Sequence, residues 1–262
     1  MANSEKVTLL GAGLYNSIPD ELTLTSLPTV SELDMVSSED FDTTMLDKIL
    51  PSAVVEKDIN FRELLEIDYY WLCRCLRLLN YGPYHTTGTI FCPSCGATSR
   101  GSYQVNLETI PVVALPAGFK NELVITKDKF IDFQGKVVLS LPTIQQTLNA
   151  AKDKVFMTAS GTINREFARL CYSIKSIGDR DNLTPMEVKA YIEKHLSPAD
   201  YKCLKSEAST LMDFGLRAGG TCQCPSCRKM EGRFIALVDD RFFRPNLDNL
   251  RAWRDNRNKR AD

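Results

Sequence analysis

The chain has 262 residues, of which 44% are hydrophobic and 25% are charged, so it can bury a sizeable core and is neither fully disordered nor collagen-like. Its 32 basic and 33 acidic residues give a net charge of −1, which predicts neither a nucleic-acid nor a membrane partner from overall electrostatics. No apolar run approaches the ~20 residues that span a bilayer, and the first residues carry no apolar leader. We therefore expect a protein of the reducing cytoplasm, in which the nine cysteines bind metal rather than form disulfides.

The first half of the chain is expected to form a strand, short helices and one clear helix. Residues 21–26 alternate between apolar and polar side chains like a half-buried strand, and the acid-rich segment 31–47 favours one or two short helices. Apolar side chains then recur at helical spacing from Asp68 until Asn80-Tyr81-Gly82, which is typical of a helix end. Asp68 suits the cap or first turn of this helix.

The second half shows three helical segments. Apolar side chains keep helical spacing over residues 167–177. Thr184-Pro185-Met186-Glu187 has the form of a capping box with proline at the first helical position, and Ser197-Pro198-Ala199-Asp200 repeats it with aspartate in place of glutamate. These signals predict helices over residues 185–195 and 198–214.

An internal repeat connects the two halves. The segment 88–95, Gly-Thr-Ile-Phe-Cys-Pro-Ser-Cys, recurs as Gly-Thr-Cys-Gln-Cys-Pro-Ser-Cys at 220–227, with six of eight positions identical at an offset of 132. At the same offset Asp68 falls on Asp200. The match therefore extends beyond the cysteine motif.

Four cysteines form the strongest chemical signal, and they stand in two Cys-x-x-Cys motifs: Cys92, Cys95, Cys224 and Cys227. Two intervening residues let both sulfurs of a tight turn face one ion, and two such knuckles supply the four sulfurs that structural zinc prefers. Because the knuckles occupy equivalent positions in the repeat, we predict that they meet and share one zinc ion. Four thiolates leave no position for water, so this zinc is expected to be structural rather than catalytic.

Other interpretations of the cysteines stay open. A redox site would place a Cys-x-x-Cys motif at the start of a helix after a strand, whereas strand-type and turn residues surround both motifs. Free buried thiols are the simplest alternative, and Cys73 and Cys75 within the predicted helix fit it. Cys222 could replace Cys224 as a ligand, although the repeat places Cys222 on Ile90 and so favours Cys224.

These patterns predict an α+β fold. It consists of two pseudo-repeated halves, each with helices and a small β hairpin or sheet that carries a zinc knuckle, and the halves share one four-cysteine site. The expected segments in chain order are an N-terminal arm (1–20), a first half (21–107), a connector (108–136), a second half (137–240) and a basic tail (241–262).

No catalytic constellation emerges from the sequence. His85 and His195 fall in a loop and at a helix end, which suits surface or capping positions better than a general base. The chain has no phosphate-binding loop, nucleophile elbow or zinc-protease motif. We therefore expect that the protein is not an enzyme.

Charge is unevenly distributed along the chain. Residues 16–47 hold eight acids and no lysine or arginine, whereas residues 241–262 hold seven bases and three acids. These segments are either two solvated surfaces or patches that dock on neighbouring subunits. A different possibility is a zinc-ribbon nucleic-acid binder that uses the basic tail on phosphates with an aromatic side chain for stacking. The tail residues concerned are Arg251, Trp253, Arg254, Arg257, Lys259 and Arg260.

Five short segments follow one another in a distinctive order: residues 27–29 (Leu-Pro-Thr), 78–84 (Leu-Leu-Asn-Tyr-Gly-Pro-Tyr), 92–96 (Cys-Pro-Ser-Cys-Gly), 224–227 (Cys-Pro-Ser-Cys) and 241–245 (Arg-Phe-Phe-Arg-Pro). In this order the chain resembles the baseplate protein family of T-even-type contractile-tailed phages, the hub-associated tail proteins. The resemblance covers roughly Leu22 to Pro245. The chain lacks the family's apolar-Pro-Ser-Lys-Gly opening and has an additional tail after Pro245.

The resemblance implies a structural role as a component of, or an assembly factor for, the baseplate hub of a phage tail. It implies several symmetric copies in the virion, assembled in the host cytoplasm with other tail and baseplate subunits as partners. The acidic N-terminal region and the basic tail would supply the contacts, without a membrane. The balanced net charge and the acidic segment argue against nucleic acid as the partner.

Overall fold

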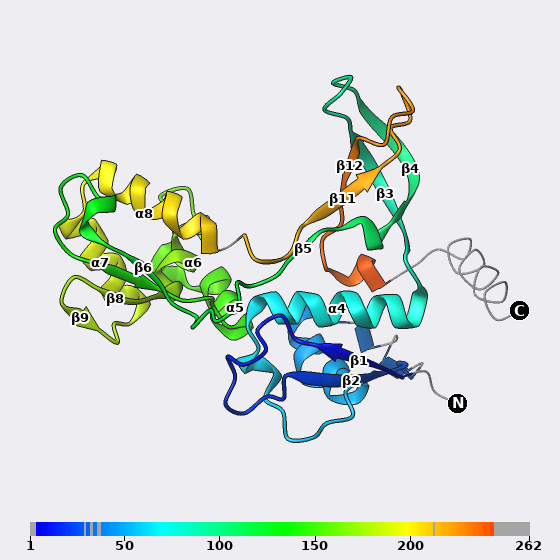
Figure 1. The fold of residues 1–262 in the computed structure, drawn as a ribbon, viewed down its shortest axis with the longest axis horizontal. Helices are drawn as coiled ribbons and strands as arrows, with labels where there is room; N and C mark the ends of the chain where they lie inside the picture. Colours follow the sequence, from blue (N-terminus) through cyan, green and yellow to red (C-terminus); the bar gives the residue numbers. More distant parts are fainter. Residues whose placement is uncertain (1–3, 29, 32–33, 36–37, 212, 244–262) are drawn as a thin grey trace, which may run out of the picture. The chain divides into compact units, whose positions relative to one another are not determined.

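The computed structural model describes residues 4–28, 30–31, 34–35, 38–211 and 213–243 (Figure 1). The chain forms two compact units, each built from separate stretches of sequence. Both Cys-x-x-Cys hairpins belong to the first unit, although the sequence analysis places them in different halves. Unit 1 contains the chain up to Phe61, Tyr70–Val113 and the chain from Gly215, and unit 2 contains Arg62–Tyr69 and Ala114–Phe214.

The N-terminal part of unit 1 is a two-stranded antiparallel sheet with short helices. Strand β1 (Ser4–Thr8) pairs with β2 (Glu21–Thr25), which confirms the strand predicted at 21–26. In β2, Leu22 and Leu24 are fully buried while their neighbours are not, as the alternation predicts. Short helical turns follow at α2 (Phe41–Thr44), a π-helical turn (Met45–Ile49) and α3 (Leu50–Ala53).

The predicted long helix is α4 (Glu66–Tyr81), which begins two residues before Asp68. Its inward side holds Leu72, Leu76 and the thiols of Cys73 and Cys75, all of them buried, so these two cysteines are core residues as expected.

Arg77 of α4 is a buried cation that sequence patterning does not reveal. Its guanidinium donates from Nε to the carbonyl of Phe242 at 2.7 Å, from Nη1 to that of Gly82 at 2.7 Å, and from Nη2 to that of Tyr84 at 2.8 Å. Burial lowers the pKa of Arg77 to about 10, so the side chain stays charged at neutral pH. Arg77 thereby joins the end of α4 to the 3-10 turn at Asp240–Phe243.

Two β hairpins complete unit 1. Their four strands form an antiparallel sheet in the order β11-β12-β3-β4, in which the two hairpins lie side by side (Figure 1). A separate pair joins β5 (Val112–Val113) to β10 (Gly215–Leu216). The strands of the sheet are β3 (Tyr84–Phe91), β4 (Thr98–Asn106), β11 (Gly219–Cys222) and β12 (Gly232–Ile235).

The described part of unit 2 contains a four-stranded antiparallel sheet and four α-helices, besides the first turn of α4. The strands run in the order β6 (Leu123–Ile125), β7 (Val137–Leu139), β8 (Ile174–Ile177) and β9 (Arg180–Asp181). The helices are α5 (Ile144–Lys152), α6 (Arg165–Ser173), α7 (Pro185–His195) and α8 (Pro198–Leu211).

The predicted helix starts in unit 2 are confirmed. Thr184 and Glu187 form a reciprocal capping box at the start of α7. At α8 the carboxylate of Asp200 accepts from the Ser197 hydroxyl at 2.9 Å, and the Asp200 N–H donates to that hydroxyl at 3.1 Å. Helix α8 ends at Leu211, short of the predicted Phe214.

The helix predicted over residues 167–177 is wrong in its second part. Helix α6 ends at Ser173, and Ile174–Ile177 forms β8, which pairs with β7. Both Ile174 and Ile177 are buried in this sheet. The partner strand lies far back in the sequence, so local periodicity could not distinguish a helix turn from this short β-branched strand.

Candidate metal centre

The first knuckle lies in the turn between β3 and β4. The N–H of Cys92 donates to the carbonyl of Ala97 at 2.9 Å, and the N–H of Gly96 donates to the carbonyl of Cys92 at 2.8 Å. Gly96 has a φ of 69°, in the left-handed region that glycine adopts without steric cost. This turn places both cysteine side chains on the same side of the hairpin tip.

The second knuckle repeats this geometry between β11 and β12. The N–H of Cys224 donates to the carbonyl of Lys229 at 2.8 Å, and the N–H of Arg228 donates to the carbonyl of Cys224 at 2.9 Å. Arg228 occupies the position of Gly96 and has a φ of 64°, an uncommon conformation for a side chain of its size. The two turns therefore share one hydrogen-bonding pattern despite this difference.

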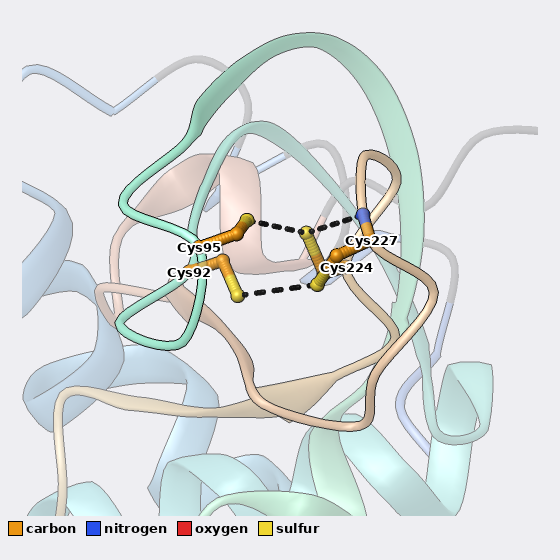
Figure 2. Close-up of side chains that lie close together, drawn as sticks. All are labelled: Cys92, Cys95, Cys224 and Cys227. Atoms are coloured by element: carbon orange, nitrogen blue, oxygen red, sulfur yellow. Dashed lines mark hydrogen bonds between the residues drawn. The ribbon is translucent and has the colours of Figure 1, made fainter.

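The four predicted cysteine side chains converge from the two turns (Figure 2). Sγ of Cys92 lies 3.7 Å from Sγ of Cys227, and Sγ of Cys95 lies 3.9 Å from Sγ of Cys224. All four sulfurs lie within 4.8 Å of one another. A tetrahedral zinc ion with Zn–S bonds of about 2.3 Å holds its sulfurs about 3.8 Å apart. The cluster thus has the dimensions that a metal such as zinc requires.

Electrostatics favour a thiolate within the cluster. The N–H of Cys227 lies 3.5 Å from Sγ of Cys224 and, with further backbone donors, lowers the pKa of Cys224 to about 6. The N–H of Lys229 lowers the pKa of Cys227, but burial and the neighbouring thiols outweigh it and raise that pKa to about 11. The backbone donors therefore favour the thiolate form of Cys224, which is the form that binds a metal cation.

The two knuckles also touch through polar side chains at the rim. The hydroxyls of Ser99 and Ser226 lie 3.2 Å apart, and Nζ of Lys229 donates to the hydroxyl of Ser94 at 2.9 Å. Cys92 and Cys224 are fully buried, whereas Cys95 is exposed, so the cluster has a closed inner side and an open outer side.

The remaining cysteines lie outside this cluster. Among the described residues the group that could hold a metal includes Cys224 and leaves out Cys222, which is half-buried in β11. Cys171 is buried in α6, and burial raises its pKa to about 12. Both Cys-x-x-Cys motifs lie in hairpin turns rather than at the start of a helix, unlike the arrangement of a thioredoxin-type redox site.

The histidines lie outside the cluster. His85 lies in strand β3 rather than in a loop as expected, and His195 ends α7 as expected. The ring of His85 lies 5.9 Å from that of Phe242, and the ring of His195 lies 4.6 Å from that of Tyr191. No helix within the described ranges is long and apolar enough to cross a membrane. The proposed phosphate-binding residues of the tail lie outside the described residues: Arg251, Trp253, Arg254, Arg257, Lys259 and Arg260.

Comparison of the chain with protein-family models, with curated proteins and with solved structures produced no match in any of the three.

Proposed function

We propose that the four-thiol cluster holds one structural zinc ion. The observation that supports this proposal is that four sulfurs lie at the spacing of a tetrahedral site, and that the pKa of one of them, Cys224, is lowered. Zinc bound there joins two hairpins whose cysteines lie 129 to 135 residues apart in sequence. Its role is to hold the hairpins in one sheet, since four thiolates leave no ligand position for substrate or water.

We further propose that the two hairpins belong to related halves of the chain. Helices α4 and α8 begin at residues 66 and 198, and this offset of 132 is the same as that of the knuckles. Asp68 and Asp200, which match at this offset, are both fully buried in the first turns of their helices. If the halves are related, Asp68→Asn and Asp200→Asn should destabilise the protein similarly in urea unfolding, and an effect from only one would contradict the relation.

On this basis we propose that the protein is a structural component of, or an assembly factor for, the baseplate of a contractile phage tail. A metal-clamped sheet without a catalytic constellation suits a rigid assembly part, and the five ordered segments resemble the hub-associated family. Other tail subunits are the partners, with contacts through the acidic segment and the basic tail. Assembly takes place in the host cytoplasm.

Metal analysis of the purified chain tests the first step. We expect about one zinc per chain, lost when Cys92 and Cys95 are both replaced by serine and retained in Cys222→Ser, the control outside the cluster. Intact disulfides in both knuckles, or no metal, would refute the zinc proposal.

Incorporation into tails tests the functional step. A chain truncated after Pro245 should keep its zinc and its folded core but enter tails or baseplate complexes less efficiently than the full chain. Unchanged incorporation would remove the docking role of the tail. Absence of the intact chain from both assembly intermediates and finished tails would refute the baseplate proposal.

A further inference from the structure

A groove lies beside the cluster, on the sheet that the two zinc-knuckle hairpins form. Within the described strands, β12 and β3 pair at one position, Arg233 with Phe91. Alternate residues of β3, β12 and β11 line a groove of about 770 Å³, among them Thr89, Ile235 and Thr221. Because alternate residues of a strand share one side, the groove lies over one face of this sheet.

The solvent-facing side of β12 is apolar in this groove. Phe234 is buried, as one face of a strand should be, but the next residue, Ile235, is apolar too and is 68% exposed. Leu237, just after the strand, is 60% exposed, and Phe91 in the groove is 46% exposed. Exposed apolar side chains that gather on one face of a sheet are typical of an interaction site.

The groove is also positively charged. Arg217 and Arg233 line it, and no acidic residue lines it among the described residues. Carboxylates are the groups that complement two arginines beside an apolar surface.

We propose that this groove binds an extended segment of another protein that carries both acidic and apolar side chains. The segment lies along the groove, packs apolar side chains against Ile235 and Phe91, and places carboxylates near Arg217 and Arg233. Phe91 is the one exposed ring among the described residues that line the groove, and its neighbour Ile235 is aliphatic, so the groove lacks the successive rings on which bases stack and favours a protein over nucleic acid. This inference deepens the proposed assembly role and rests on it only for the identity of the partner.

A peptide-binding assay on the full zinc-loaded chain tests the groove. The probe is a fluorescein-labelled decapeptide of alternating glutamate and valine, followed by fluorescence anisotropy. Two comparison peptides replace every glutamate by lysine or every valine by serine. We expect the glutamate–valine peptide to bind at least about tenfold more tightly than either of them, because both charge and apolar contact contribute.

Two substitutions and one matched control locate the binding. Ile235→Glu and Arg233→Glu should each weaken binding about tenfold or more. Met230 is 67% exposed in the same hairpin but does not line the groove, so Met230→Glu adds the same charge and should leave binding unchanged. Zinc content and circular dichroism establish that each variant is folded.

Four outcomes would overturn the inference. They are equal binding of the lysine peptide, equal weakening by Met230→Glu, preferential binding of a single-stranded oligonucleotide that Ile235→Glu abolishes, and self-association that Ile235→Glu abolishes without any peptide binding. Because the assay uses the isolated chain, its result is separate from zinc analysis and tail incorporation, which test the proposed function.

Discussion

Removing one complete knuckle should unfold unit 1 as effectively as removing the metal. The perturbation is the double replacement of Cys224 and Cys227 by serine, compared with the same replacement of Cys92 and Cys95. Serine is nearly isosteric with cysteine but is a poor zinc ligand, so each double variant abolishes the clamp with little change in volume. Both variants should lose the same amount of stability, because a shared ion requires both knuckles.

The magnitude follows from the length of chain that the clamp closes. Cys95 and Cys224 are 129 residues apart. In the chain-entropy treatment, a cross-link that closes a loop of this length and is retained in the unfolded chain raises the free energy of the unfolded state by about 5 kcal/mol. The two cysteines within one knuckle are separated by only two residues, so their own closure contributes far less. We therefore expect each double variant to lower the free energy of unfolding by about 5 kcal/mol.

Urea unfolding with and without a zinc chelator measures this loss. The chelated wild-type protein should match the two double variants, and the variants should not respond to chelator. Hydrogen exchange then locates the change, with faster exchange expected in β11 and β12 than in the sheet of unit 2. Cys222→Ser, which alters a neighbouring thiol outside the cluster, should retain the wild-type response.

Two results would refute the shared clamp. A wild-type protein whose stability does not depend on chelator would show that no metal contributes to folding. A large loss in only one double variant would show that the knuckles act separately. The single variants Cys95→Ser and Cys227→Ser should likewise resemble each other.

Three further predictions concern other positions. Arg77→Met removes three charge-assisted hydrogen bonds, at roughly 1.5 kcal/mol each, and should lower the free energy of unfolding by about 4 kcal/mol in urea titration; a loss below about 1 kcal/mol would contradict this. Gly96→Ala should lower the free energy of unfolding by about 1 kcal/mol, because a Cβ disfavours the positive φ at this position. Arg228→Gly removes the same conflict and should not destabilise the protein. Thermal melts in which Arg228→Gly is the less stable of the two variants would refute the argument. Burial opposes ionisation of Asp200, but the backbone N–H groups of residues 131–133 and the hydroxyl of Ser197 donate to its carboxylate and lower its pKa. The resulting stabilisation is present above the unfolded pKa of about 3.9 and is lost as pH falls through the folded pKa, so Asp200→Asn should flatten the acid limb of a plot of melting temperature against pH.

Features with local causes could be predicted from the sequence. The start of α7 depends on the side chains of Thr184 and Glu187, which lie three residues apart, and the structure places the helix at the predicted bounds. The knuckle turns are equally local, since two residues between cysteines set the geometry. The meeting of the two knuckles is a long-range feature, yet it could be predicted because the same eight-residue pattern recurs around both Cys-x-x-Cys motifs and four thiolates suit one metal ion.

Features that depend on distant partners could not be predicted in this way. Strand β8 depends on β7, and local periodicity extended α6 through it. A charged residue in a helix is usually exposed, so the sequence does not reveal that Arg77 is buried. Its burial depends on the carbonyl groups of Gly82, Tyr84 and Phe242, which all lie outside α4. Residues 234–238 are all apolar, which is typical of a strand buried on both faces, so the exposure of Ile235 and Leu237 is not visible in the sequence.

The cluster and the groove are coupled through a single junction. Phe91, which forms the one pair between β3 and β12, directly precedes Cys92, so the clamp lies at the base of the groove. A metal bound by the four cysteines would add a restraint between the two hairpins, beside the Ser99–Ser226 and Lys229–Ser94 contacts. Loss of metal should therefore weaken peptide binding in the same chelator range that lowers stability, and peptide should in turn slow zinc release, because coupling between two ligands is reciprocal. A peptide affinity that survives chelation would show that the hairpins hold the groove open without the metal.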